Sequence, residues 1–234
     1  MPKNDTIFKR LALATEIEKG KIREAFQLHK NAEDNTISEV YRAAAGHTMI
    51  SPFRDKHALP YKQILIDVAD KLKPGLGWTD FKIDDRHTEE NIEDQIEEYL
   101  RIIIDKKLMS LSEKERQEKK KKIEEELKRK GVDQATISSI GTAIASGSVG
   151  ATLASSVAVS IFYSTFLSSI SALLFGPSLI TLLASGAGVT AVVAAPLLIV
   201  SLGNPAYRKT IPATLEFIWI RKRLEAEAKL GSKI

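Results

Sequence analysis

The fold of this chain is decided by residues 134–207, which read QATISSIGTAIASGSVGATLASSVAVSIFYSTFLSSISALLFGPSLITLLASGAGVTAVVAAPLLIVSLGNPAY. This stretch contains no Asp, Glu, Lys, Arg or His, although 27% of the whole chain is charged. A helix needs about 20 consecutive apolar residues to cross a bilayer, so the stretch is long enough for more than one such helix. It predicts where the protein acts, and it holds no residue set that specifies a reaction.

Two segments within this stretch have the length of a membrane-spanning helix, residues 153–175 and 179–202. Gly176, Pro177 and Ser178 separate them, and a turn is expected there because proline cannot continue a helix cleanly. The pattern therefore predicts a long hydrophobic helical hairpin. Its predicted span residues include Leu153, Phe162, Phe166, Leu174, Leu179, Val192 and Leu198.

Serines in the first segment recur at helical spacing, so they share one face of the predicted helix. These are Ser156, Ser160, Ser164, Ser168 and Ser171. Small and hydroxyl-bearing faces let helices approach closely in a membrane, which favours a packing face. Two other interpretations stay open: a stripe lining the water of an oligomeric pore, and simple packing in a soluble bundle.

Basic residues flank both ends of the charge-free stretch. Residues 208–234 hold seven Lys or Arg and three Asp or Glu, a net charge of +4, which equals the net charge of the whole chain. Basic flanks favour the cytoplasmic side, so an inserted hairpin would have both termini in the cytoplasm of a bacterial cell. We expect the inner membrane or the cytoplasm as the location. The candidate lipid contacts are Trp219, Arg221, Lys222 and Arg223.

The rest of the chain gives helix signals and almost no strand signals, so the predicted class is all-α. We expect a soluble helical domain over residues 1–110, a charged helical arm over 111–133, the hydrophobic region over 134–207 and a basic amphipathic helix over 208–234. A first helix is expected to be capped by Asp5 or Thr6 and to continue through Ile17 to a break at Gly20.

Later helices have clearer start signals. Pro60 is expected at the first position of a helix, because its missing N–H costs nothing there. Thr88 is a good cap for the next helix, and Ser112 with Glu115 forms a capping-box pattern before the charged arm.

No pattern in the chain announces catalysis or a cofactor. There is no cysteine, and the four histidines do not pair at helical spacing, so neither a disulfide nor a metal site is predicted. A phosphate-binding loop and a nucleophile elbow are also missing from the pattern. We therefore expect no enzyme, no catalytic, metal or cofactor-binding residues, and no nucleic-acid partner.

Two short stretches resemble a bacterial family. Residues 61–72, YKQILIDVADKL, resemble the central helix of the YaaW-type proteins, and residues 204–213, NPAYRKTIPA, resemble their C-terminal signature. This is a family of unknown function, and some members carry a label that likens them to ubiquinol–cytochrome c chaperones. The resemblance implies an assembly-factor role at a respiratory membrane and supplies no catalytic residues. It groups the signature residues Tyr207, Arg208, Thr210 and Pro212, and we expect Thr210 to cap a helix that starts at Pro212.

Two functions follow as hypotheses. The leading interpretation is a non-enzymatic membrane-inserting or membrane-associated protein, a pore-forming or membrane-perturbing effector with an anionic lipid bilayer as its partner. The alternative is a soluble or peripheral chaperone for a membrane complex, with the hydrophobic hairpin buried in its own bundle and a protein client as its partner. Homo-oligomers are compatible with both.

Overall fold

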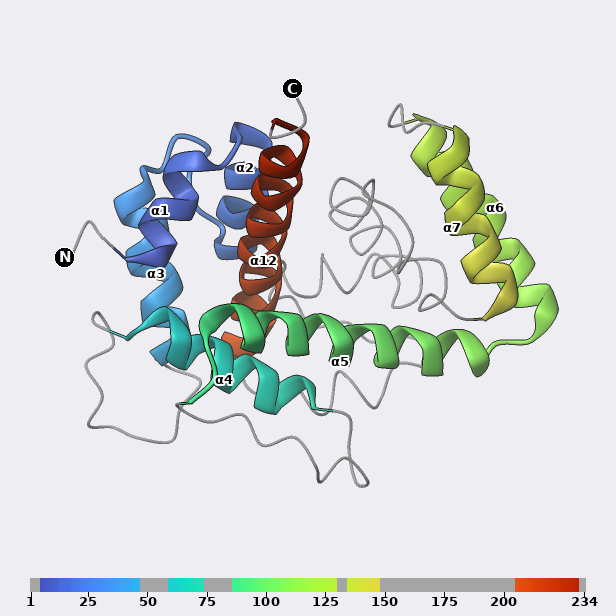
Figure 1. Cartoon of the computed structure of the whole chain (residues 1–234), viewed down its shortest axis with the longest axis horizontal. Helices are drawn as coiled ribbons and strands as arrows, with labels where there is room; N and C mark the ends of the chain where they lie inside the picture. Colours follow the sequence, from blue (N-terminus) through green and yellow to red (C-terminus); the bar gives the residue numbers. More distant parts are fainter. Residues whose placement is uncertain (1–4, 47–58, 74–85, 130–133, 148–204, 232–234) are drawn as a thin grey trace. The chain divides into compact units, whose positions relative to one another are not determined.

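The computed structural model describes residues 5–46, 59–73, 86–129, 134–147 and 205–231 (Figure 1). Within these ranges the regular structure is entirely helical, which confirms the all-α class. The helices are α1 (Thr6–Leu13), α2 (Glu16–Phe26), α3 (Asp34–Gly46), α4 (Tyr61–Leu72), α5 (Glu89–Met109), α6 (Glu113–Arg129), α7 (Gln134–Ser146) and α12 (Pro205–Gly231). The predicted hairpin, residues 153–175 and 179–202, lies outside the described ranges.

Side-chain caps start several of these helices. The Asp5 carboxylate accepts a hydrogen bond from the Phe8 N–H at 3.1 Å, which confirms Asp5 as the cap of α1. Ser112 and Glu115 form the predicted capping box before α6, with the Ser112 N–H donating to the Glu115 carboxylate at 2.8 Å.

The predicted first helix was wrong in its length. Thr15 and Glu18 form a capping box that starts a new helix at Glu16, so the first helix ends at Leu13. Ile17 and Gly20 therefore lie within α2, and Gly20 is not a break. The start of α4 is shifted by one residue, since Pro60 is the N-cap of that helix and Tyr61 is its first residue.

The C-terminal helix also begins earlier than predicted. α12 starts at Pro205 and contains Pro212 in its interior, so Thr210 does not cap a helix that starts at Pro212. The Thr214 hydroxyl donates to the Thr210 carbonyl at 2.8 Å. Thr210 and Thr214 are both buried, which places this part of α12 inside the fold.

The chain divides into two compact units, and each is described by itself. Unit 1 comprises residues 1–96 and 180–221, and unit 2 comprises residues 97–179 and 222–234. α5 and α12 therefore each contribute residues to both units. The predicted division into four successive parts remains a prediction.

The core of unit 1 centres on an aromatic cluster from four helices. Tyr41 of α3 lies 5.0 Å from Phe217 of α12, measured between ring centroids, and 6.1 Å from Phe26 of α2. Tyr61 of α4 completes the cluster, with its ring centroid 6.0 Å from that of Phe217. Residues from the start and the end of the chain thus share one core. Tyr61 belongs to residues 61–72, one of the two stretches that resemble the YaaW-type family.

In unit 2, α6 and α7 lie side by side (Figure 1). α7 buries one face, formed by Ile137, Ile140, Ala143 and Ile144, and α6 buries Ile123. Gly141 of α7 faces the Glu124 side chain of α6, because an added Cβ at Gly141 would overlap Oε1 of Glu124. The beginning of the charge-free stretch is therefore packed against the charged arm.

The leading functional interpretation is contradicted at this level. Among the helices of the described ranges, none combines the length and the apolar character needed to cross a membrane. The description of the protein as a membrane-inserting, transmembrane or pore-forming effector is therefore corrected. α7, the described part of the charge-free stretch, is a 13-residue helix, too short to span a bilayer.

Candidate functional site

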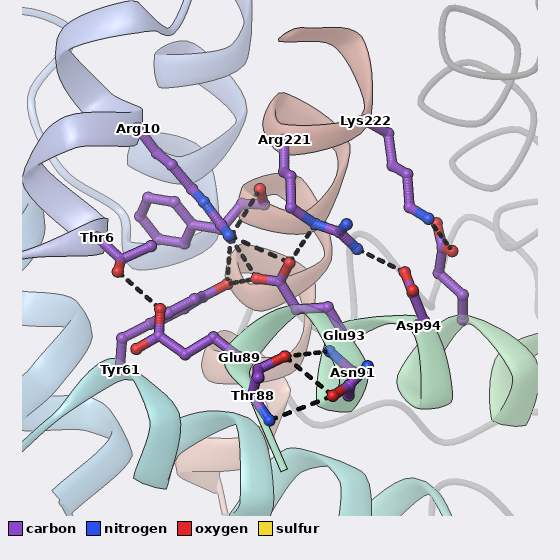
Figure 2. Close-up of polar contacts among 12 residues, drawn as sticks. Thr6, Arg10, Tyr61, Thr88, Glu89, Asn91, Glu93, Asp94, Arg221 and Lys222 are labelled. Carbon is purple, nitrogen blue, oxygen red and sulfur yellow. Dashed lines mark hydrogen bonds and ion pairs between the residues drawn. The ribbon is translucent and has the colours of Figure 1, made fainter. Parts of the chain in front are cut away.

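Unit 1 contains a buried cluster of charged side chains centred on Glu93 of α5 (Figure 2). Arg10 of α1 donates to both carboxylate oxygens of Glu93, with Nη2 3.1 Å from Oε2. The Tyr61 hydroxyl donates to Oε1 of Glu93 at 2.6 Å. Arg10 also donates to the Phe217 carbonyl at 3.3 Å, and its guanidinium carbon lies 5.0 Å from the centre of the Tyr61 ring. One carboxylate therefore ties α1, α4 and α5 together beside α12.

A second arginine reaches the same carboxylate from α12. Nε of Arg221 lies 2.5 Å from Oε2 of Glu93, and Nη2 of Arg221 donates to Asp94 at 2.6 Å. Two arginines thus face Glu93 and Asp94, so the positive and negative charges of the cluster balance. A buried carboxylate that is paired and hydrogen-bonded in this way avoids most of the cost of leaving water.

Burial and charge act together on the ionisable groups of the cluster. Burial alone lowers the pKa of Arg10, but the neighbouring Tyr61 and Glu93 more than offset it, so the pKa of Arg10 is raised. Burial, reinforced by the Glu93 charge, holds the pKa of Tyr61 well above its usual range. Tyr61 therefore stays protonated and acts as a donor. The Glu93 side chain has no exposed surface, so this carboxylate joins helices within unit 1 and is itself closed to a substrate.

Polar contacts at the edge of unit 1 support the position of α1. Arg42 of α3 donates to the Asp5 carboxylate and to the Leu59 carbonyl, and its Nε donates to Ser38 at 3.3 Å. The Thr6 hydroxyl donates to Glu89 of α5 at 2.6 Å, as Figure 2 shows. The N-terminal helix is thus joined to α3 and α5 at its start and to the Glu93 cluster further along.

A second buried carboxylate in unit 1 has a different environment. Glu216 of α12 has a side chain that is 4% exposed, and Lys21 of α2 places Nζ 3.1 Å from its Oε1. Lys21 Nζ also lies 5.9 Å from the centre of the Trp219 ring. Burial raises the pKa of Glu216 to about 7, although Lys21 acts in the opposite direction. This carboxyl therefore titrates near neutral pH.

The four residues that the sequence predicts as lipid contacts interact with other residues of their own units. Trp219 is buried, and Arg221 pairs with Glu93 and Asp94. In unit 2, Lys222 places Nζ 3.1 Å from Oε2 of Glu97, and Arg223 pairs with Glu227 at 2.9 Å. Contact of these residues with lipid remains a prediction.

The signature residues 207–212 occupy the first turns of α12. Lys71 of α4 places its Nζ 5.4 Å from the centre of the Tyr207 ring, so the two stretches of the family resemblance touch. Thr210 is buried, Pro212 is half-buried inside the helix, and the Arg208 side chain lies outside the described part of the structure. These contacts support packing of α12 against α4.

Other predicted site residues fall outside the described ranges. The span residues are Leu153, Phe162, Phe166, Leu174, Leu179, Val192 and Leu198, and the serine stripe is Ser156, Ser160, Ser164, Ser168 and Ser171. Within the described residues, no group of three His, Asp or Glu side chains is placed to hold a metal ion. An open hollow of about 720 Å³ lies along α2 and the turn that follows it, and the Arg23 side chain in its lining donates to Glu16 at 2.8 Å.

Comparison of the chain with protein-family models, with curated proteins and with solved structures finds no match. The resemblance of residues 61–72 and 204–213 to the YaaW-type proteins therefore stays a prediction.

Arg10, Glu93 and Asp94 were not singled out from the sequence, and Arg221 was singled out only as a candidate lipid contact. A signal was present, because Arg10 lies three residues after Ile7 and Glu93 three residues before Ile96, so each charge falls on the apolar face of its helix. The pairing of these two charges depends on how α1 and α5 pack, which helical spacing alone does not encode.

Proposed function

We propose that the chain is a non-catalytic chaperone or assembly factor that binds apolar helical segments of a membrane-protein client. In this proposal the charged helix α6 covers α7, the start of the charge-free stretch, until the client is bound. The observation that carries the proposal is the pairing of α6 with α7. The buried face of α7 belongs to the charge-free stretch and packs against the protein's own charged arm.

The composition of α6 suits a cover. Fourteen of its 17 residues are Glu, Lys or Arg, so the face of α6 that is turned away from α7 is charged and well hydrated. Its described apolar contribution to the contact is Ile123, whereas α7 presents a row of isoleucines. A narrow apolar contact releases little free energy on burial, at about 25 cal/mol per Å² of apolar surface. Such a cover is able to open when another apolar helix competes for α7.

A reversible lock on the α6–α7 pair tests the proposal. The chain has no cysteine, so Glu124→Cys with Gly141→Cys introduces a single defined pair where a Cβ at Gly141 would face the Glu124 side chain. The assay dilutes a synthetic transmembrane peptide from detergent and follows its aggregation by light scattering. We expect the reduced double variant to suppress aggregation, the oxidised form to lose that activity, and added reductant to restore it.

The two single-cysteine variants are the matched controls, since oxidation cannot lock the helices within one chain. They should suppress aggregation under both redox conditions. If the unaltered protein does not suppress aggregation, the chaperone proposal is wrong. If the locked form remains fully active, the α6–α7 pair is not the cover.

A further inference from the structure

The contact between α2 and α12 in unit 1 includes one buried carboxyl, Glu216, whose cationic neighbour among the described residues is Lys21. We propose that this contact is a proton-controlled latch, in which Glu216 of α12 gains and loses the proton and Lys21 of α2 responds to its charge. The latch is defined as Lys21, Glu216 and the adjacent Trp219. The proposal concerns unit 1 alone and does not depend on the chaperone function.

The geometry of the latch leaves its polar groups poorly satisfied. The Lys21 ammonium lies 3.1 Å from Oε1 of Glu216, close enough for an ion pair, but among the described residues no donor is directed at Oε1 in hydrogen-bond geometry. Trp219, three residues further along α12, is buried, and its Nε1–H has no hydrogen-bond partner among the described residues. The Lys21 side chain is 37% exposed, so its charge stays partly hydrated. An ionised Glu216 is therefore held in an apolar setting by one loosely placed cation.

Glu93 in the same unit is an internal comparison. It is also fully buried, but it accepts hydrogen bonds from Arg10 and Tyr61 and pairs with Arg221. Glu216 has Lys21 as its compensating charge, and Glu18 on the same helix as Lys21 adds a repelling negative charge. Burial without matching donors disfavours the charged form of a carboxyl. Burial and the nearby Glu18 charge therefore disfavour the ionised form of Glu216, and its pKa is raised.

The sign of the effect follows from the reference value. Burial raises the pKa of Glu216 from an ordinary 4.5 to about 7. Between these two values the closed latch holds a proton that the opened latch releases, so closure is favoured at low pH and becomes weaker as the pH rises. Above about 7 the carboxyl is ionised in both forms and the effect is complete. Raising the pH should therefore loosen α2 from α12 and expose Trp219.

Fluorescence of Trp219 gives a direct readout. The chain has two tryptophans, so Trp78→Phe leaves Trp219 as the reporter. Quenching by acrylamide is measured at fixed salt from about pH 5.5 to about pH 8.5, a range that brackets the expected titration. We expect the quenching constant to rise roughly twofold with a midpoint near neutral pH, as local opening makes the indole accessible.

Three variants in the Trp78→Phe background separate a titrating latch from an ordinary packing contact. Glu216→Gln should abolish the midpoint and keep quenching low. Glu16→Gln, which changes an exposed acid on α2, should leave the midpoint in place. Lys21→Met should move the midpoint to higher pH, because Lys21 favours the ionised form of Glu216. A merely structural contact would not show this upward movement.

A second measurement keeps the proposal testable if Glu216→Gln does not fold. NMR titration of the unaltered chain, with ¹³C label at the glutamate side-chain carboxyl carbons, should reveal one carboxyl that titrates with a midpoint near neutral pH. In the Lys21→Met variant the midpoint of this carboxyl should lie at a different pH. A carboxyl population that titrates entirely near the ordinary glutamate value would overturn the proposal. So would quenching that is independent of pH, or a midpoint that Glu216→Gln leaves unchanged.

Discussion

Arg221 and Glu93 form an ion pair inside unit 1, with Nε of the arginine 2.5 Å from Oε2 of a carboxylate that has no exposed surface. Arg10 approaches the same carboxylate from α1, so Glu93 is held by cations from helices near both ends of the chain. Such a pair resists the loss of either partner, because the group left behind is a buried charge without full compensation.

Replacement of Arg10 by methionine tests this dependence. Arg10→Met keeps much of the side-chain volume and removes the donors to Glu93, so it should lower the free energy of unfolding by about 3–5 kcal/mol. Urea unfolding followed by far-ultraviolet circular dichroism measures the change. The matched control is Arg223→Met, whose partner Glu227 is 57% exposed, and it should cost less than about 1 kcal/mol. Equal losses in the two variants would contradict a special role of the buried cluster.

The hydroxyl of Tyr41 gives a second prediction, since it donates to Oγ1 of Thr214 at 2.7 Å in the fully buried core. Tyr41→Phe keeps the aromatic packing against Phe217 and removes this hydrogen bond, so it should cost about 0.5–1.5 kcal/mol. Tyr41→Ala should cost several times more, because the ring packing is lost as well. Thermal unfolding of the two variants at one pH gives the comparison, and a Phe variant as unstable as the Ala variant would refute it.

The close approach at Gly141 predicts a difference between two substitutions in unit 2. The atoms that an added Cβ would meet are the ends of the flexible side chains of Glu124 and Lys120, which form an ion pair at 3.8 Å. Gly141→Ala should be tolerated, because these ends can move and alanine favours the helix by about 1 kcal/mol. Gly141→Leu should push the helices apart and raise hydrogen-exchange rates in α6 and α7. Thr142→Leu, at an exposed neighbouring position, is the control and should leave these rates unchanged.

The raised pKa of Glu216 makes the stability of unit 1 depend on pH. The folded state binds the proton more tightly than the unfolded state, so this group lowers stability as the pH rises from about 4.5 to about 7. The total loss is at most about 3 kcal/mol. Glu216→Gln removes this loss. The free energy of unfolding of the variant, relative to that of the unaltered protein, should therefore be higher at pH 8 than at pH 5. Urea unfolding at several pH values tests it, and parallel curves for the two proteins would be inconsistent with titration of Glu216.

The helices were largely predictable because local chemistry starts them. Thr88, Ser112 and Asp5 cap helices as their side chains predict, and the apolar stripe of α4 is buried from Tyr61 to Leu72. The errors arose where two local signals compete. Thr15 starts a helix inside a continuous apolar pattern, and Pro212 is retained within α12 although proline commonly marks a helix start.

The buried charges could not be predicted in the same way. Arg10, Glu93 and Glu216 have partners that lie far away in the sequence, and no local pattern specifies which charges meet. Arg221 was interpreted as a lipid contact because it follows Trp219 in a basic run. Its carboxylate partners come from packing of α12 against α5, which is a tertiary property.

The path of α12 through unit 1 has a consequence for the order of biosynthesis. Arg10 donates to the carbonyl of Phe217, a residue 207 positions later, and Phe217 lies at the centre of the aromatic core. A ribosome therefore releases α1, α3 and α4, and then the whole charge-free stretch, before the segment that completes this core is made. During that interval Tyr41 and Tyr61 lack their ring partner, and Glu93 lacks Arg221. Nascent chains stalled before Pro205 should accordingly be cut by protease within α1 to α4, and chains extended by a linker long enough to bring α12 out of the ribosome should become resistant.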